Sequence, residues 1–125
     1  MITTAELRRL ALSLPETEEK AHFGKPDFRV CNKIFAGLST DGAIANVKLS
    51  AEIQADLLSS HAHAFSPAEG AWGRAGWTYM QLAGIDQGVA QALLAEGWRL
   101  VAPKRLVASY DKGQVGGARP ARPKR

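Results

Sequence analysis

The sequence is short of the features that mark secreted, membrane-bound or disulfide-stabilised proteins. A single cysteine, Cys31, stands among 125 residues and excludes an internal disulfide. No apolar run approaches the roughly 18–20 residues of a membrane span, and the first residues lack the basic and apolar regions of a secretory signal. We therefore expect a cytoplasmic protein, most naturally a bacterial one. Cys31 falls in an apolar strand pattern, which predicts a buried and inert thiol.

Motifs for metal, phosphate and nucleophilic chemistry are absent as well. The glycines of residues 70–76 are not followed by the G-K-[ST] of a phosphate-binding loop. His61 and His63 have metal-like spacing, but zinc needs three or four ligands and no third one stands nearby. Cys31 and His22 lack a third group that would orient them as a catalytic pair. We predict no metal, no cofactor and no catalytic residues, and hence not an enzyme.

The net charge of +4 is unevenly distributed along the chain. Five of the 16 basic residues lie after Asp111, where there is no acidic residue, so the preceding part has 11 basic and 12 acidic side chains. The glycines, prolines and basic residues of 112–125 predict a disordered tail, and residues 1–111 are expected to form one domain. An argument for nucleic-acid binding from the pI near 9.5 is mainly an argument about this tail.

The first half of the chain predicts one helix followed by short strands. Thr3 and Glu6 have the spacing of a capping box for a helix over 4–14. The stretch Pro15–Lys20 looks turn-like, and Asn32-Lys33 and Thr40-Asp41-Gly42 look like tight turns between strands. The expected strands cover Phe28–Cys31, Ile34–Leu38 and Ala43–Leu49, with a further short strand around Phe23.

The second half predicts helix, irregular segment, strand and helix. Ser50 caps a helix that runs to about Ser60, and an irregular stretch over His61–Gly76 precedes a strand over Trp77–Leu82. Asp86 caps a last helix that ends at Pro103. Its inner face is expected to consist of Val89, Ala92, Leu93, Trp98 and Val101. The order α-β-β-β-(β)-α-β-α predicts an α+β two-layer sandwich, an antiparallel sheet of four to five strands with helices packed on one face.

Several segments carry a likeness to a known family. They are His22-Phe-Gly-Lys-Pro-Asp-Phe-Arg-Val30 continuing through Asn32-Lys-Ile-Phe-Ala36, Lys48-Leu-Ser50, Phe65-Ser-Pro-Ala68, Gly76-Trp-Thr78 and Trp98-Arg-Leu-Val-Ala-Pro-Lys-Arg-Leu106. Over residues 3–107 the chain resembles the MmcQ/YjbR family of small bacterial proteins. The resemblance implies a CyaY-like or secretion-chaperone-like sandwich, and a DNA-binding protein with two wings.

A candidate binding surface follows from strand direction. Arg29 points away from Phe28 and Val30, and therefore toward the sheet face without helices. The candidate nucleic-acid-binding residues are Lys25, Arg29, Lys33, Lys48, Arg74, Trp77, Lys104 and Arg105, with tail contacts from Arg119, Arg122, Lys124 and Arg125.

Two functions remain open at this stage. The first is a non-catalytic, monomeric protein that binds nucleic acid, DNA in particular, through a basic sheet face and wings. The alternative is a protein- or peptide-interaction module that uses the same face and the loop between Trp72 and Trp77. The basic residues have an ordinary interpretation too. Arg29 has Asp27 or Glu19 within reach for an ion pair, Lys104 and Arg105 are placed to cap the C-terminus of the last helix, and Trp77 has the character of a core residue.

Overall fold

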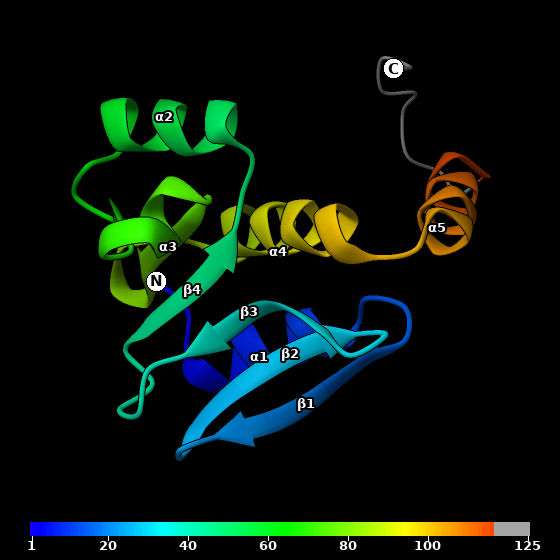
Figure 1. The fold of residues 1–125 in the computed structure, drawn as a ribbon, viewed down its shortest axis with the longest axis horizontal. Coiled ribbons are helices and arrows are strands. Elements are labelled where there is room, and N and C mark those ends of the chain that lie inside the picture. The colour runs from blue at the N-terminus through cyan, green and yellow to red at the C-terminus, as the bar shows by residue number, and fades with distance from the viewer. Residues whose placement is uncertain (117–125) are drawn as a thin grey trace.

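The computed structural model describes residues 1–116 and shows one antiparallel sheet with helices against it (Figure 1). The elements are α1 (Thr4–Leu12), β1 (Thr17–His22), β2 (Lys25–Val30), β3 (Lys33–Leu38), β4 (Ile44–Lys48), α2 (Ala51–Ser60), β5 (Phe65–Pro67), α3 (Gly70–Arg74), β6 (Trp77–Gln81), a 3₁₀ turn (Leu82–Gly84), α4 (Gln87–Val101) and α5 (Lys104–Gly116). The strand order is β1-β2-β3-β4-β6-β5, which confirms the α+β class and exceeds the predicted four to five strands by one.

The core lies between one face of the sheet and the helices α1, α2 and α4. Residues alternate along the strands, so that Ala45 and Val47 of β4 and Thr78 and Met80 of β6 are buried on the same face. Gln54 of α2 donates to Thr78 Oγ1 at 3.0 Å, which places α2 on this side as well. Among residues 1–116, no helix layer covers the opposite face of β1 to β4, and the five-residue helix α3 (Gly70–Arg74) lies next to β5 and β6.

The predicted helix starts are confirmed by their caps. The Thr3 side chain accepts from the Glu6 N–H, and the Glu6 carboxylate accepts from the Thr3 N–H. Ser50 Oγ accepts from the N–H of Ile53, and Asp86 Oδ1 accepts from the N–H of Val89. These local signals are reliable because each involves residues only three positions apart.

Four sequence-based expectations about the first half are wrong in whole or in part. Phe23, expected in a short strand, lies in the turn between β1 and β2 with φ of +53°. In the stretch Pro15–Lys20, Pro15 and Glu16 do form a turn, but the rest belongs to β1, which pairs with β2 from Thr17 to His22. The tight turn before β3 lies at Cys31-Asn32, one residue earlier than predicted, with φ of +50° and +65°. Cys31 is therefore exposed in a turn instead of buried in a strand. Asparagine tolerates this left-handed conformation well, and the hairpin geometry imposes it on its neighbour.

The stretch between α2 and β6 is more regular than expected. It contains the short strand β5, which pairs with the outer side of β6, and the five-residue helix α3. Gly76 has φ of +106° and lies so close to the Leu49 carbonyl that a Cβ would overlap it. Only glycine fits there, and it lets the chain turn from α3 into β6.

The prediction for the buried face of α4 is confirmed at Leu93 and Trp98, and Val101 is partly buried, but Val89 and Ala92 are exposed. Ala90, Leu94 and Gly97 complete the buried face. The missing side chain of Gly97 lets the helix lie directly on β3 and β4. Trp98 is fully buried and donates from Nε1 to the Pro15 carbonyl at 3.0 Å.

A further helix follows the proline that was expected to end the last one. Pro103 does break α4, but α5 begins directly after it and continues to Gly116. Arg99 holds α5 by donating to Asp111 at 3.0 Å and by lying 5.4 Å from the centre of the Tyr110 ring. Helix α5 continues past Asp111, where the domain was expected to end, and its Tyr110 packs on Trp98. The predicted tail contacts at residues 119, 122, 124 and 125 lie outside the described residues.

None of the helices formed by residues 1–116 combines the length and the apolar character needed to cross a membrane.

Candidate functional site

The centre of the uncovered sheet face is a row of paired residues from adjacent strands. Asp27 pairs with Gly37, Gly37 with Asn46, and Asn46 with Tyr79. Gly37 has no side chain and is nevertheless buried, because the Pro26 carbonyl and the Asn46 amide lie close to the position that its Cβ would take. A strand position without a side chain weakens packing, and it lets another group approach the backbone closely.

A hollow of about 480 Å³ opens over this part of the face. Its lining comes from β2, β3, β4, β6 and the segment around α3, and consists of Lys25, Ile34, Asn46, Ala68, Glu69, Trp72, Trp77 and Tyr79. The volume lies within the range of about 300–1,000 Å³ typical of ligand sites. The hollow is thus large enough to hold part of a ligand.

Aromatic side chains dominate one side of the hollow. Trp72 of α3 is 67% exposed, and its ring lies edge-on to Trp77 of β6, with centroids 6.4 Å apart. Two residues along β6, Tyr79 donates from its hydroxyl to Glu69 at 3.1 Å. Burial and this carboxylate raise the pKa of Tyr79 above the ordinary value of 10.0. Exposed tryptophan has a high cost in water, so this group is suited to contact with a partner.

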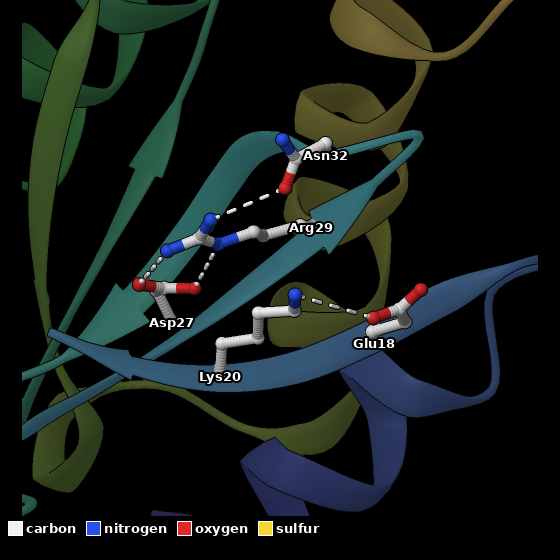
Figure 2. Close-up of polar contacts among 5 residues, drawn as sticks. All are labelled: Glu18, Lys20, Asp27, Arg29 and Asn32. Atoms are coloured by element: carbon white, nitrogen blue, oxygen red, sulfur yellow. Dashed lines mark hydrogen bonds and ion pairs between the residues drawn. The ribbon is translucent and has the colours of Figure 1, made fainter.

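The other half of the face carries both signs of charge (Figure 2). Arg29 donates to Asp27 from Nε at 2.7 Å and from a terminal nitrogen at 3.1 Å, and also to Asn32 at 3.3 Å. The hydrogen bond to Asp27 raises the pKa of the guanidinium. On β1 next to this pair, Lys20 lies 4.0 Å from Glu18. The ion pair with Asp27, considered above as the ordinary interpretation of Arg29, is present, and this half is not a uniformly basic surface.

The remaining candidate residues fall into two groups. Lys25 lines the hollow, Lys48 pairs across the strands with Trp77, and Arg74 ends α3 two residues after Trp72. Lys33 begins β3 and is exposed beside Ile34. In contrast, Lys104 and Arg105 begin α5, which Figure 1 shows at the opposite end of the molecule from α3.

Arg105 confirms this separation, because it lies 3.8 Å from Glu16 in the connection between α1 and β1. The face predicted as one basic surface is therefore two separate regions, and only the group around Trp77 borders the hollow.

Asn46 and Glu69 were not singled out from the sequence. A signal for Asn46 is nevertheless there, since a polar residue between the apolar Ala45 and Val47 must point to the uncovered face. No such pattern exists for Glu69, which lies outside the regular elements and reaches the hollow only through the placement of α3.

The histidines line a smaller hollow elsewhere. His61 and His63 border a space of about 280 Å³ together with Asp86 and Val89, at the start of α4. Their ring centroids are 6.1 Å apart. Among the described residues there is no group of three or more histidine, cysteine or acidic side chains that could hold a metal ion.

Comparison with known proteins identifies the family to which the chain belongs. The profile of the YjbR family matches residues 12–100. The chain belongs to the YjbR family. The crystal structure of Deinococcus radiodurans protein DR2400, which carries a DUF419 domain, is similar to this YjbR-family chain with a TM-score of 0.74 and 21% identity, over 96% of this chain and 97% of that one.

At this level of identity, DR2400 shows that the fold is shared. No curated protein matches the chain. The family membership and the fold agree with the resemblance seen in the sequence, and the role of the hollow has to be argued from its own chemistry.

Proposed function

We propose that this YjbR-family protein is a non-catalytic binding protein that holds single-stranded nucleic acid in the hollow of its uncovered sheet face. The observation that carries the proposal is the combination of three accessible aromatic rings, Trp72, Trp77 and Tyr79, with cations that border them. Sequence-tolerant binding of single strands uses these two components, rings for the bases and cations for the backbone.

The aromatic rings favour an unpaired base as the contacting group. A ring that stacks on a base contributes about 1–3 kcal/mol, and the face of any base is suitable. The rings of Trp72 and Trp77 are nearly perpendicular, with an interplanar angle of 74°, so they do not stack face to face on each other. Bases in a duplex are already stacked on each other, so these rings favour a single strand.

The charges around the hollow favour a phosphate backbone. Within the described residues, Lys25 and Lys48 have no ion-pair partner within 4.0 Å, whereas Arg29 does. Glu69, the acidic side chain of the lining, accepts the Tyr79 hydroxyl. Phosphate contacts of this kind make binding salt-dependent without requiring a basic protein overall.

Duplex recognition has less support from the same face. Helix α2 has no basic residue and α3 has five residues, so neither resembles a recognition helix for the major groove. The β1–β2 half of the face alternates acidic and basic side chains, and it would repel part of a duplex backbone.

A peptide or protein partner is the second candidate. It is favoured by one observation, the apolar character of Trp72 and Ile34, which are 67% and 38% exposed. Aromatic residues are common in the buried centres of protein interfaces. The titration described below separates a peptide partner from single-stranded nucleic acid, because contacts with phosphates make the affinity for nucleic acid depend on the salt concentration.

The test uses the intrinsic fluorescence of the full chain. Two of its three tryptophans, Trp72 and Trp77, border the hollow and Trp98 is buried, so a stacked oligonucleotide should quench most of the accessible signal. We expect quenching by single-stranded dT of about 12 nucleotides and much weaker quenching by a duplex of equal length. To remove the contribution of the tail, the same titration is repeated with Arg119, Arg122, Lys124 and Arg125 replaced by glutamine.

Salt dependence gives the matched control. Lys48→Gln should reduce the slope of log K against log salt by about 0.7, the value for one phosphate contact on a single strand. Lys104→Gln, which removes the same charge from α5, should leave the slope unchanged. Absence of quenching by any oligonucleotide at about 50 mM salt would refute the proposal and leave the protein-interaction alternative.

A further inference from the structure

Strand β1 is one edge of the sheet, and no strand from residues 1–116 lies along its outer side. It is six residues long, and Glu18–Ala21 are all exposed. The opposite edge strand, β5, has three residues and ends in Pro67, which cannot donate to a neighbouring strand. A long exposed edge offers backbone N–H and C=O groups to another strand. Further pairing of this sheet is therefore expected at β1.

The turn that follows β1 shows which of its backbone groups bond to β2. His22 pairs with Lys25 around a two-residue turn at Phe23 and Gly24, with φ of +53° and +78°. In such a hairpin the pair next to the turn is hydrogen-bonded, and every second pair along the strands is hydrogen-bonded as well. Starting from His22, the even-numbered residues of β1 therefore bond to β2.

The odd-numbered residues Thr17, Glu19 and Ala21 direct their N–H and C=O groups to the outer side of the sheet. The N–H of Thr17 supports this assignment, because it donates to the Leu14 carbonyl at 3.3 Å and not to β2. The N–H groups of Glu19 and Ala21, and the carbonyls of all three residues, are directed to where a neighbouring strand would lie.

The side chains of β1 carry both signs of charge. Glu18 and Lys20 lie on the uncovered face, 4.0 Å apart between carboxylate and ammonium (Figure 2). Glu19 lies on the α1 side, where its carboxylate accepts from Arg8 Nε at 2.8 Å. Charges on an edge strand usually prevent pairing, because an arbitrary neighbour leaves them without a counter-charge. A second copy of β1 differs from an arbitrary neighbour, because it supplies both signs at the same spacing.

One antiparallel register of two β1 strands satisfies the backbone and the charges together. Opposite residues of an antiparallel pair point to the same face, so Glu19 can lie opposite Glu19 of the second copy, with Thr17 opposite Ala21. Glu18 of each copy then faces Lys20 of the other. A shift of two residues in either direction puts Glu18 opposite Glu18 or Lys20 opposite Lys20, and like charges in these positions are destabilising. The charges of β1 thus select a single register.

We infer that β1 is a self-association edge, at which two copies of this chain form one continuous antiparallel sheet about a two-fold axis at Glu19. The two Glu19 carboxylates lie on the α1 side, and each is neutralised by its own Arg8. Phe23 is 90% exposed, and its position two residues beyond Ala21 brings it to the connection between α1 and β1 of the second copy. Both uncovered faces lie on the same side of the joint sheet. The inference does not depend on what the hollow binds.

The contact is small, and a weak dimer is expected. One pair of six-residue strands buries less than the roughly 1,200–2,000 Å² of a stable interface. We expect a dissociation constant on the order of 100 µM. At about 1 µM the protein then remains the monomer expected from the sequence.

Sedimentation velocity of the full chain, at about 5 µM and about 500 µM protein in about 50 mM salt, measures the association. Lys20→Glu puts acidic side chains opposite each other and should weaken the dimer by about tenfold or more. Adding Glu18→Lys to this variant exchanges the two charges, recreates opposite-charge pairs and should restore the dimer. Lys104→Glu makes the same charge change on α5, away from β1, and should leave the association unchanged.

A backbone variant tests the edge independently of charge. Ala21→Pro removes an N–H that points to the outer side, and proline is tolerated on an edge strand at such a position. The variant should lose the dimer while its circular dichroism spectrum and thermal midpoint stay close to those of the unmodified protein.

Three results would overturn the inference. The first is a protein that stays monomeric at about 500 µM, five times the expected dissociation constant. The second is a dimer that persists in both Lys20→Glu and Ala21→Pro, because it then uses another surface. The third is loss of the dimer in Lys20→Glu without recovery when Glu18→Lys is added, because the selected register requires that recovery.

Discussion

Gly97 lies where α4 packs directly on β3 and β4, and replacing it tests how the core positions the hollow. A Cβ at Gly97 would lie 2.8 Å from Val47 Cγ2, 2.9 Å from the Lys48 carbonyl oxygen and 3.2 Å from the Phe35 carbonyl oxygen. Two of these three contacts are with strand backbone, which cannot rotate away as a flexible side chain can. Gly97→Ala therefore requires α4 to move away from β3 and β4.

Two opposing effects decide whether Gly97→Ala raises or lowers the free energy of unfolding. Alanine is favoured over glycine in a helix by about 0.8–1.0 kcal/mol. Overpacking of a core costs about 1–3 kcal/mol, and the backbone contacts put this substitution in the upper part of that range. We expect Gly97→Ala to lower the free energy of unfolding by about 1–2 kcal/mol.

Gly88 in the same helix is the matched control. A Cβ there would meet only Asp86 Oδ1, at 3.5 Å, which is an ordinary contact. Gly88→Ala should raise the free energy of unfolding by up to about 1 kcal/mol. Urea denaturation followed by far-ultraviolet circular dichroism measures both variants. Equal stabilisation by the two substitutions would refute the close packing of α4 on the sheet.

Further predictions concern titration and thiol chemistry. In a Tyr110→Phe background, the phenolate absorbance of Tyr79 should have its midpoint above 10, and Glu69→Gln should lower it because the carboxylate is lost. Because the pKa of Tyr79 is higher in the folded state than in the unfolded state, the stability that Tyr79 contributes is present below pH 10 and declines as the pH rises above it. A titration midpoint that Glu69→Gln does not change would contradict the role of the carboxylate. Because Cys31 is exposed, it should react fully with a thiol reagent in the native protein. Its reaction rate in the native protein should be within about tenfold of the rate in the urea-unfolded protein, whereas a buried thiol would react only on unfolding.

Local signals in the sequence predicted much of the fold. Caps and the alternation of β6 depend on residues within a few positions of each other, and Thr78 and Met80 are buried as that alternation requires. The fold class followed from the order of the elements. Strand β1 was missed because its charged residues alternate between the open face and the α1 side, and on the α1 side Glu19 meets Arg8 at 2.8 Å. Its strand character comes from pairing with β2, which is not visible in composition.

The hollow was harder to predict, because its position depends on contacts between distant parts of the chain. The direction of Arg29 and the ion pair with Asp27, two residues away on the same strand, followed from strand alternation, and the structure adds that the pairing is bidentate. Trp72 meets Trp77 only because α3 folds back over β6. Composition placed the basic residues in one group, whereas tertiary structure divides them between the hollow and α5.

Two glycines with opposite roles place the hollow where it is. Gly97 lets α4 lie against the carbonyls of Phe35 and Lys48 on the covered face, and Gly37 lets the Asn46 amide lie close to β3 on the other face. Strands β3 and β4 are thus packed closely by α4 on one side, and on the other side the amide of Asn46 covers Gly37 at the floor of the hollow. A binding surface built in this way depends on a missing side chain more than on charge. Gly37→Ala, whose Cβ would lie 3.2 Å from the Pro26 carbonyl oxygen and 3.3 Å from Asn46 Oδ1, should therefore weaken single-strand binding more than neutralising Lys33 does.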